Sequence, residues 1–405
     1  MSSREADEIA AFYRDHPYPP PVADLDQYRA QWQDPERHRV EHHRLWPTLP
    51  YRDDHTILVA GCGTSQAAKM AVRYPRAHIV GIDVSATSVA TTRALVAQHQ
   101  LTNVEVHEHP IETVADLGRS FDHIVCTGVI HHLAEPGVGL RALRDVLAPQ
   151  GAMQLMVYAT YGRLGISMMQ DYSRRLGVEP TTTDIDDLVA TLREQPEGHP
   201  IGHLLRTTPD FGHDDALADA LLNPRERSFT VPELLDTVAT AGLRFGRWVR
   251  QAPYRPQCGS LSEVPHSSRI ASLPEAEQFA AVELFRGTMV RHSAVLHRDD
   301  SPLPDPGVRW DDSTWTTYVP LVPSTATLIE ERLPDGAAAA VLNRAHVDRD
   351  LVLFLDTDER DRFEAIDGTR PLGEIAGNDP TLFEKLWWHD LVMVDASATS
   401  GGDRP

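Results

Sequence analysis

A single stretch of this 405-residue chain, ILVAGCGTSQAAKMAVRYPRAHIVGID (57–83), decides what its core can be. The apolar run 57–60 is too short for a helix and predicts a strand. Gly61–Gly63 then forms a turn where backbone can approach a ligand closely, and 66–74 predicts a helix. Asp83 closes a second strand twenty residues after the turn, where α/β folds bind the hydroxyls of a ribose. The stretch therefore predicts a strand, turn, helix and strand that bind a nucleoside.

The residue three positions after Gly63 limits the class of ligand that the turn can bind. A fingerprint for a dinucleotide requires Gly or Ala at the third small position, so that the helix packs closely on the strand and its N-terminus meets the phosphates. Gln66 occupies that position here. The turn therefore disfavours a dinucleotide and favours a nucleoside with an uncharged linkage, such as S-adenosylmethionine.

The downstream segments extend the pattern in a fixed order. FDHIVCTGVIHHL (121–133) reads as a fourth strand, and a helix (139–147) and a strand (152–158) follow it. In this order and spacing the chain resembles the class I S-adenosylmethionine-dependent methyltransferases, with a core of the methyltransferase type 11/12 kind. The resemblance covers 50–160 closely, and SFTVPELLDTVATAGLRFGRW (228–248) resembles the last core helix and the next strand of that family.

This resemblance implies a fold and a cofactor. The fold is α/β, with a Rossmann-like seven-stranded sheet and a helical lid insertion. The cofactor is S-adenosyl-L-methionine, which is converted to S-adenosyl-L-homocysteine. The implied cofactor-binding residues come from the glycine turn, the ribose acid, the segment beside the adenine and the end of the fourth strand: Gly61, Cys62, Gly63, Asp83, Ile111, Glu112, Thr127 and Gly128.

Three positions depart from the family pattern. Val59 stands where many members have an acid for the cofactor's amino group, Ser65 replaces a frequent glycine, and Pro110 stands where an aspartate often reads the adenine amine. We expect backbone carbonyls or Gln66 to substitute for the missing acid. The alternative for Gln66 is an ordinary exposed residue of the helix.

The N-terminal segment FYRDHPYPPP (12–21) places two tyrosines and a histidine beside prolines. Such a segment is stiff and extended, and it resembles the caps that fold over the cofactor in this family. We hypothesise that Tyr13 contacts the cofactor and that Tyr18 lines the active site. The alternative is that both rings only attach the segment to the core.

Two adjacent histidines, His131 and His132, follow the fourth strand directly. Ligands bind at this carboxyl edge in open α/β sheets. One imidazole could accept a proton from the substrate while the other packs or caps. Many members of the family align the reacting atoms without any base, so the resemblance does not require one.

Composition excludes several classes of partner. The formal charge of −21 and the pI near 5.3 oppose binding to nucleic acid, which needs a basic surface. The same charge favours a cationic or neutral acceptor only slightly, because net charge affects steering and not the chemistry of a pocket. The longest apolar runs are too short to span a bilayer and the N-terminus is polar. The sequence therefore predicts a cytoplasmic protein without a membrane partner.

Cysteine and histidine usage gives two further expectations. The cysteines Cys62, Cys126 and Cys258 cannot form a paired framework, which fits a reduced intracellular protein. The His42-His43 pair and the 107–109 segment lack a third ligand at metal-binding spacing. No metal is expected.

The chain is too long for one ordinary domain. Its predicted parts are an N-terminal cap over the active site (1–50), the cofactor-binding core (51–160), a helical lid or substrate insertion (161–230), the C-terminal part of the core sheet (231–298), a linker (299–325), a small winged-helix-like α+β domain (326–397) and a disordered tail (398–405).

Two of these parts bear on the substrate. In the insertion, Arg163 and Arg206 could bind a carboxylate, although exposed arginines are common, and Met168 and Met169 read as helix core. In the C-terminal domain, AIDGTRPLGEI (365–375) resembles PqqD-like peptide-binding winged-helix domains. Acidic residues around it oppose DNA binding. Peptide binding, dimerisation and a purely structural appendage remain open for this domain.

Together these features predict a methyltransferase that acts by direct displacement on an oxygen, nitrogen or carbon atom of a small metabolite or natural-product intermediate. A first alternative is a peptide or protein acceptor that the C-terminal domain delivers. A second alternative is a regulatory protein that binds the cofactor without turnover. A homodimer is compatible with each of the three.

Overall fold

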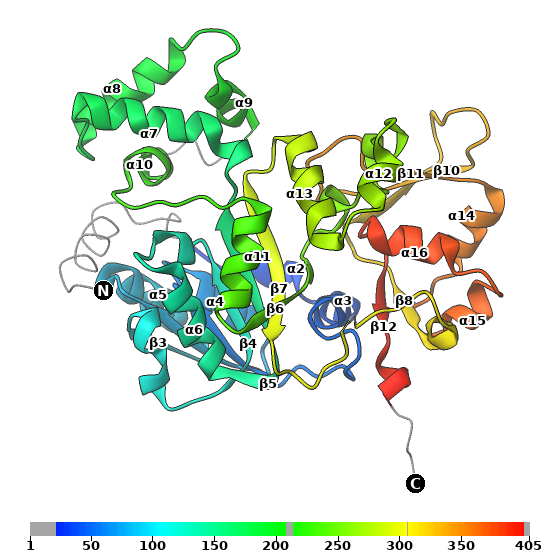
Figure 1. Cartoon of the computed structure of the whole chain (residues 1–405). Helices are drawn as coiled ribbons and strands as arrows, with labels where there is room; N and C mark the ends of the chain where they lie inside the picture. The colour runs from blue at the N-terminus through cyan, green and yellow to red at the C-terminus, as the bar shows by residue number, and fades with distance from the viewer. Residues whose placement is uncertain (1–21, 208–213, 306, 401–405) are drawn as a thin grey trace. The chain divides into compact units, whose positions relative to one another are not determined.

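A seven-stranded mixed sheet carries the fold, and its strands lie in the order β3-β2-β1-β4-β5-β7-β6 (Figure 1). Strand β1 pairs in parallel with β2 and β4, β2 with β3, and β4 with β5. The predicted α/β Rossmann-like sheet is confirmed. The strands are β1 (Thr56–Ala60), β2 (His78–Asp83), β3 (Val104–Glu108), β4 (Phe121–Thr127), β5 (Leu147–Tyr158), β6 (Leu243–Trp248) and β7 (Arg291–Arg298).

The structure, a computed structural model, describes residues 22–207, 214–305 and 307–400. The chain divides into two compact units. Unit 1 comprises Met1–Ala30, Asp54–Leu243 and Arg286–His292, and unit 2 comprises Gln31–Asp53, Arg244–Phe285 and Ser293–Pro405. Among the described residues, no helix is long and apolar enough to cross a membrane.

Helices of unit 1 pack their apolar faces on the first strands. Helix α4 begins directly after the glycine turn and buries Ala67, Met70 and Ala71 against Ile57 and Ile79 of the sheet. Full burial of a residue such as Ile57 contributes about 1.5–3 kcal/mol. The helices of this part are α2 (Asp26–Gln31), α4 (Gln66–Arg73), α5 (Ala86–Gln98), η1 (Ile111–Leu117), η2 (Ile130–His132) and α6 (Pro136–Val146).

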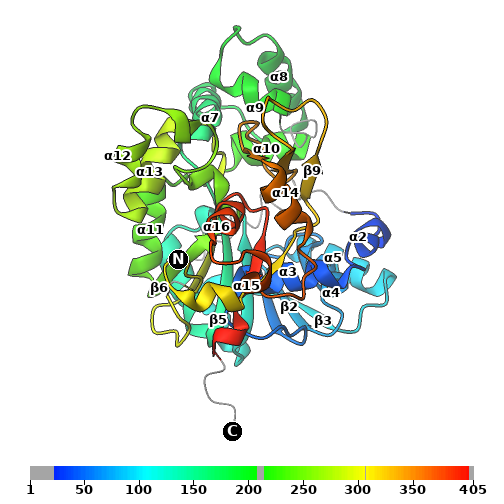
Figure 2. The same cartoon turned by 90° about the vertical axis from the view of Figure 1, so that its right-hand side faces the viewer.

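The predicted helical insertion is present after β5. It contains η3 (Tyr161–Arg163), α7 (Leu164–Leu176), α8 (Thr182–Arg193), α9 (Pro200–Thr207) and α10 (Asp214–Leu222). Figures 1 and 2 show these helices gathered in one group. They share a core that includes Ile166, Leu188 and Leu217. Gly165 permits this packing, because a Cβ there would lie 2.2 Å from the backbone nitrogen of Ile201.

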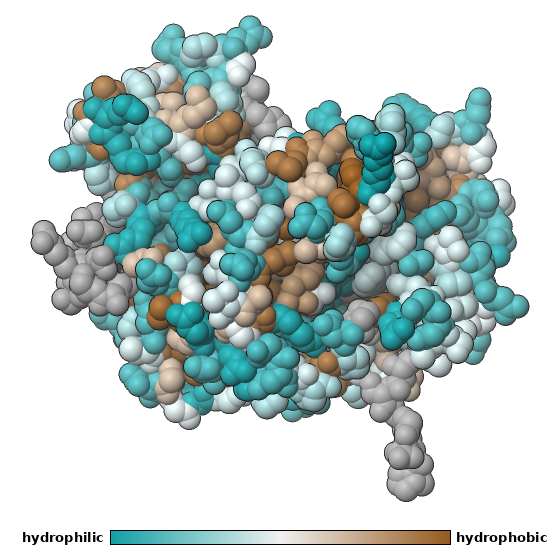
Figure 3. All heavy atoms as spheres, viewed as in Figure 1, coloured by the Kyte–Doolittle hydropathy of each residue, from teal (hydrophilic) through white to brown (hydrophobic). Residues whose placement is uncertain are grey.

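Helix α7 presents two different faces. Met169 is buried in the core of the insertion, as predicted, whereas Met168 is 43% exposed. Leu164, Tyr172 and Leu176 are also exposed large hydrophobic residues of this helix. In the view of Figure 3, hydrophobic side chains are interspersed with hydrophilic ones over α7 and α8.

The predicted last core helix is α11 (Val231–Thr240), and a local signal fixes its start. Thr230 accepts a hydrogen bond from the Glu233 backbone, and the Glu233 carboxylate accepts from the Thr230 backbone at 2.8 Å. Such a capping box satisfies donors that the helix leaves unpaired. The strand that follows is β6, as the sequence predicts.

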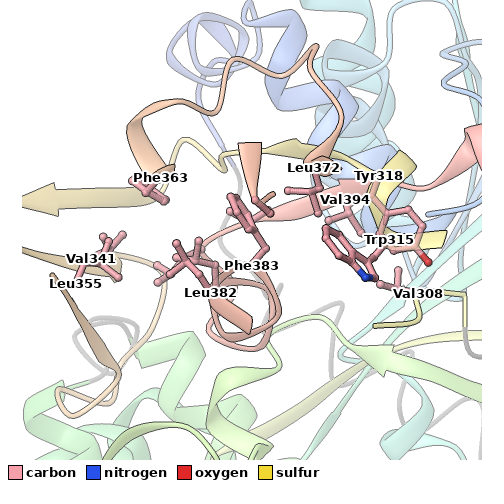
Figure 4. Close-up of a cluster of buried hydrophobic side chains, with 14 of the residues drawn as sticks. Val308, Trp315, Tyr318, Val341, Leu355, Phe363, Leu372, Leu382, Phe383 and Val394 are labelled. Atoms are coloured by element: carbon pink, nitrogen blue, oxygen red, sulfur yellow. The ribbon is translucent and has the colours of Figure 1, made fainter. Parts of the chain in front are cut away.

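The C-terminal half of unit 2 has its own hydrophobic core. A three-stranded antiparallel sheet (β11-β10-β9) and a two-stranded sheet (β12-β8) enclose it together with three short helices. Figure 4 shows Trp315, Phe363, Leu372 and Phe383 in this cluster.

The remaining elements of unit 2 are α3 (Pro35–Leu45), η5 (Ala252–Tyr254), η6 (Gly259–Glu263), α12 (Ser267–Ala271), α13 (Glu275–Arg286), η7 (Ser313–Thr317), β8 (Val319–Leu321), β9 (Ala326–Ile329), β10 (Ala339–Asn343), β11 (Val352–Leu355), α14 (Thr357–Glu364), α15 (Leu372–Ile375), α16 (Thr381–Trp388), β12 (Met393–Asp395) and η8 (Ser397–Ser400).

A buried carboxylate, Asp390, joins distant segments of unit 2. It pairs with Arg247 of β6 at 3.2 Å and lies 3.1 Å from His346 Nε2. It also accepts the backbone N–H groups of Gln251 at 2.6 Å and Ala252 at 3.1 Å. Burial alone would raise the pKa of Asp390, but the His346 hydrogen bond and the Arg247 charge hold that pKa below its ordinary value. The four partners therefore stabilise the ionised form.

A second carboxylate of unit 2, Asp395, ties the end of the described chain to helix α3. Its Oδ2 lies 3.3 Å from Nε2 of the buried His43, and Ser397 donates its backbone N–H at 3.0 Å. The next residue, Ala396, donates its backbone N–H to the carbonyl of Pro47 at 2.7 Å. Burial opposes ionisation of Asp395, but His43 and Ser397 outweigh it and lower the pKa of this carboxyl.

We expect the stability of Asp395→Asn to depend less on pH in the acid range than the stability of the wild type. Because the folded pKa lies below the unfolded value of about 3.9, ionised Asp395 stabilises the fold above pH ~4. That contribution is lost as the pH falls through the folded pKa. At neutral pH the variant should be less stable by roughly 1.5–3 kcal/mol. Urea unfolding at a series of pH values measures the free energy of unfolding, and Asp300→Asn, a change at an exposed position, serves as the control. If the free energy of unfolding of Asp395→Asn changed with pH in parallel with that of the wild type, the prediction would be contradicted.

Candidate functional site

A cavity of about 540 Å³ lies within unit 1, beside the carboxyl ends of β1, β2, β4 and β5. This volume falls in the range of small-molecule sites, ~300–1,000 Å³. One half of the cavity is lined by the glycine turn and Asp83, and the other half by His132, Tyr158 and residues of the insertion. We call these the nucleoside half and the acceptor half, after the ligands that the sequence predicts for them.

The glycine turn has a backbone that other residues would disturb. Gly61 and Gly63 have φ values of +71° and +53°, which L side chains rarely adopt. A Cβ on Gly61 would also lie 2.3 Å from Cγ2 of Val129. The turn is held by the N–H groups of Gly61 and Cys62, which donate to Ile82 O at 2.8 and 2.9 Å. Burial raises the pKa of the Cys62 thiol far above its usual range, so this thiol stays neutral.

Asp83 is the last residue of β2, and two backbone N–H groups hold its carboxylate in place. Its Oδ2 accepts the N–H of Gly63 at 2.8 Å and its Oδ1 accepts the N–H of Ser85 at 2.9 Å. Burial raises the pKa of Asp83, while these amide hydrogen bonds oppose the rise. Each oxygen retains acceptor capacity, so the group can bind the two hydroxyls of a ribose.

Gln66 links the start of α4 to the end of β4. Its Nε2 donates to Thr127 Oγ1 at 2.9 Å, and both residues line the cavity. Thr92 donates its hydroxyl to Gly63 O at 2.8 Å from below the turn. Gln66 is half-buried and therefore is not an ordinary exposed residue of the helix.

The three residues that depart from the family pattern occupy defined positions in the structure. Val59 is fully buried in the hydrophobic cluster of the first strands and does not line the cavity. Ser65 precedes α4 at its N-cap and is buried. Pro110 precedes η1, which brings Ile111 and Glu112 to the cavity wall. His109 Nδ1 donates to Pro110 O at 2.8 Å and orients its ring beside them.

The two histidines after β4 have different environments. His132 lines the cavity and its Nδ1 lies 2.7 Å from the carbonyl oxygen of Arg225. Because a carbonyl only accepts, Nδ1 carries the proton of the neutral ring and Nε2 carries the lone pair. His131 is fully buried behind the cavity lining, with its ring 4.0 Å from that of Tyr158. Burial, His132 and Arg163 lower the pKa of His131 well below its usual value, so this ring is neutral.

The insertion contributes a buried ion pair to the acceptor half. Arg163 Nη2 lies 2.7 Å from Glu226 Oε1, and both side chains are more than nine-tenths buried. Gln170 donates to the same Glu226 oxygen at 3.1 Å. The guanidinium of Arg163 lies 3.6 Å from the ring centroid of Tyr158, a cation–π geometry. These contacts fix Arg163 at the cavity wall, whereas the side chain of Arg206 is not described.

Most of the predicted site residues meet at this cavity. Gly61, Cys62, Gly63, Gln66, Asp83, Ile111, Glu112, Thr127, Gly128 and His132 all line it. His131 does not, because η2 turns it inward. Tyr13 and Tyr18 lie outside the described residues.

The sequence analysis missed several lining residues. Tyr28 of α2, Lys69 and Arg73 of α4, Asp219 of α10, Arg225 and Arg291 also reach the cavity. For α4 a signal existed, since Gln66, Lys69, Met70 and Arg73 share one face at helical spacing. No spacing relates the others. Among the described residues no group of three or more His, Cys, Asp or Glu could hold a metal ion.

Comparisons with known proteins agree with this geometry. A family profile described as a methyltransferase domain matches residues 58–153. The uncharacterized protein syc1184_c of Synechococcus sp. is 29% identical over 316 residues, which are 75% of this chain and 74% of that protein. The ubiquinone biosynthesis O-methyltransferase of Neisseria meningitidis serogroup C is 26% identical over 138 residues, 32% of this chain. This chain spans only 58% of the length of that enzyme.

A solved structure shares the fold over most of the chain. PKMT2 from Rickettsia typhi, in complex with AdoHcy, superposes with a TM-score of 0.61 at 13% sequence identity. The likeness covers 90% of this chain and 75% of that one. The shared fold therefore extends beyond residues 58–153 and includes most of both units.

Proposed function

We propose that this chain, whose core is a class I S-adenosylmethionine-dependent methyltransferase domain, transfers a methyl group to an oxygen atom of a small organic acceptor. The observation that carries the proposal is the continuity of the cavity. It runs from the glycine turn and Asp83 past the end of β4 to His132 and Tyr158. The O-methyltransferase name of the Neisseria meningitidis relative supports an oxygen acceptor.

The nucleoside half fits the cofactor on two grounds. Gly61 and Gly63 line the cavity without side chains, which lets a ligand approach the backbone of the turn closely. Asp83 is oriented by two amide donors and keeps acceptor capacity for ribose hydroxyls. In the proposed complex Ile111 and Glu112 would flank the adenine, and Thr127 and Gly128 would border the sulfonium. S-adenosylmethionine supplies an electrophilic methyl group there and leaves as S-adenosylhomocysteine.

In the acceptor half the protein positions the nucleophile and takes its proton. The hydroxyl of the acceptor lies against His132, whose Nε2 lone pair accepts the hydroxyl proton as the oxygen attacks. The bond from His132 Nδ1 to Arg225 O fixes both the tautomer and the ring orientation. Residues of the insertion line this half, and alignment of the reacting atoms supplies much of the rate. Tyr13 and Tyr18 are proposed to complete the wall from the N-terminal segment.

We expect His132→Asn to lower kcat by roughly 10²–10⁴-fold, the usual contribution of a general base. The asparagine amide can still donate to Arg225 O, so the variant keeps this contact and removes the Nε2 lone pair together with the ring contacts to His131 and Tyr158. The affinity for S-adenosylmethionine should be unchanged. Turnover is measured as S-adenosylhomocysteine release and affinity by calorimetric titration.

The neighbouring histidine provides the matched control for this experiment. His131→Phe keeps an aromatic ring against Tyr158 and removes both ring nitrogens. It should retain turnover within a few-fold, and a thermal melt checks its folding. If His131→Phe abolished turnover while His132→Asn did not, the roles assigned to the two histidines would be reversed.

A peptide or protein acceptor is the second candidate function. Its support is the segment 365–375, which resembles PqqD-like peptide-binding winged-helix domains in sequence and lies in a region with three short helices, α14, α15 and α16, and the strand β12. In this reading the domain delivers a peptide to the cavity. A third candidate, cofactor binding without turnover, is supported by the loss of the acid at Val59.

One experiment separates the three candidates. Full-length protein with methyl-labelled S-adenosylmethionine is incubated with a small-molecule library and, separately, with a peptide library. Label in the small-molecule fraction supports the proposed function, and label in peptides supports the second candidate. Cofactor binding without label in either fraction would leave only the regulatory candidate.

A further inference from the structure

The described residues of the acceptor half carry a net positive charge, whereas the whole chain carries a net negative charge. Three arginines from separate elements line it: Arg163 of η3, Arg225 after α10 and Arg291 at the start of β7. Among the residues that the structure describes, Asp219 is the carboxylate that lines this half, and Glu226 pairs with Arg163 behind the wall. Three guanidinium groups against these two carboxylates leave a formal charge of +1, in a chain whose net charge is −21.

Arg163 is preorganised and retains a donor. The Glu226 bond and the Tyr158 ring hold its guanidinium in place, and its side chain is 7% exposed. Its Nε is buried and has no hydrogen-bond partner among the described residues. A buried donor that lacks a partner is unfavourable unless a ligand or ordered water supplies an acceptor. The planar guanidinium fork matches the geometry of carboxylate and phosphate groups, and a carboxylate is the smaller of the two.

Arg291 supplies the second cation. Its side chain is exposed and makes no hydrogen bond or ion pair with any residue that the structure describes. Among the described residues, no carboxylate pairs with its charge. Arg163, in contrast, pairs with Glu226 at 2.7 Å. An anionic group in this half would meet both guanidinium groups.

We propose that the methyl acceptor is a small hydroxy- or phenol-carboxylic acid whose carboxylate binds Arg163 and Arg291. This inference rests on the methyl-transfer function proposed above and names its substrate class. The ring of Tyr158 lies between the two ends of the acceptor, 6.2 Å from the ring of His132 and 3.6 Å from the guanidinium of Arg163. A small acid can therefore place its carboxylate on the arginines and its hydroxyl on His132.

The test uses acceptors in matched pairs that differ only in charge. Full-length protein is assayed with 3,4-dihydroxybenzoate and 3,4-dihydroxybenzamide, and with malate and malamide. Initial rates of S-adenosylhomocysteine formation give kcat and KM, and binding of each compound to the S-adenosylhomocysteine-loaded protein is titrated by calorimetry. We expect the better acid to exceed its amide by at least about tenfold in kcat/KM or in affinity.

Variants assign the preference to the arginines. Arg291→Gln should raise KM for the acid about tenfold and leave KM for the amide and the cofactor affinity unchanged. Arg163→Gln combined with Glu226→Gln removes the buried pair without leaving one charge unpaired, and should lose the preference as well. Arg174→Gln, an exposed arginine of α7 paired with Asp171, serves as the matched control and should behave as wild type.

Each contrary result has a distinct meaning. Amides that are bound or methylated as well as their acids, or a wild-type preference that survives both arginine variants, would overturn the carboxylate inference and leave the methyltransferase proposal standing. Acids that neither bind nor react would overturn it too. Label that appears only in the peptide library described above would overturn the proposed function itself.

Discussion

Asp83→Asn is expected to weaken the binding of S-adenosylmethionine and S-adenosylhomocysteine by roughly 100-fold. Two hydrogen bonds from ribose hydroxyls to an ionised carboxylate each contribute about 1.5–3 kcal/mol, and an amide can keep only part of them. The same carboxylate also accepts the N–H of Gly63 at 2.8 Å. The substitution therefore weakens both the direct contact and the turn that faces the ligand.

Calorimetric titration of both ligands measures the effect. Asp116→Asn, a change of the same kind at an exposed position of η1, should bind both ligands like wild type. NAD, titrated in parallel, should not bind, because Gln66 occupies the third position of the glycine pattern. Undiminished binding of S-adenosylmethionine by Asp83→Asn would remove Asp83 from the cofactor site.

Asp390→Ala is expected to destabilise unit 2 by about 3–5 kcal/mol, the usual result of removing one partner of a buried ion pair. Arg247 would remain buried without its carboxylate, and the N–H groups of Gln251 and Ala252 would lose their acceptor. In a unit of this size the midpoint of thermal unfolding should fall by roughly 10 °C.

An exposed carboxylate of the same unit gives the contrast. Asp358 pairs with Arg362 at 2.8 Å but is 72% exposed, and such surface pairs contribute ~0–1 kcal/mol. Asp358→Ala should therefore melt close to wild type. Calorimetric scans of the wild type, Asp390→Ala and Asp358→Ala measure the three unfolding midpoints. A loss for Asp390→Ala no larger than that for Asp358→Ala would show that the buried carboxylate contributes little.

The nucleoside half of the site was predictable because its signals are local. Within 57–83 the strand, the turn, the helix and the acid follow one another directly, and the structure confirms each as β1, the glycine turn, α4 and β2. The positions of Ile111 and Thr127 at the cavity were expected from the resemblance, since Ile111 begins η1 shortly after β3 and Thr127 ends β4. For these residues the position in the chain determines the position at the sheet edge.

The boundary between α6 and β5 was less predictable. The sequence predicts a helix over 139–147 and a strand from 152, whereas β5 begins at Leu147. The pairing of β4 with β5 shifts register here, because Phe121 pairs with Leu147 but His123 pairs with Ala152. The Pro149–Gly151 segment that reads as a turn is accommodated in this irregular part of the strand. Proline and glycine indicate a turn locally, while the pairing with β4 is a tertiary effect.

The acceptor half could not be predicted as a unit. Arg163, Arg225 and Arg291 are brought to one cavity by the fold of the insertion and the start of β7, and nothing in their spacing relates them. The same holds for the choice between the two histidines, because the 3-10 turn at 130–132 decides which ring lines the cavity. Burial and hydrogen-bond partners of single side chains require the three-dimensional structure.

The contact between His43 and Asp395 has a consequence for the synthesis of the chain. About 350 residues separate the two partners, and synthesis at ~5–20 residues per second takes roughly 20–70 s to cover that distance. During this time α3 emerges from the ribosome without its native neighbours β12 and β8. Unit 2 thus completes its fold only after Asp395 has been synthesised, and a ribosome stalled before Asp395 would hold a nascent chain with an unfinished unit.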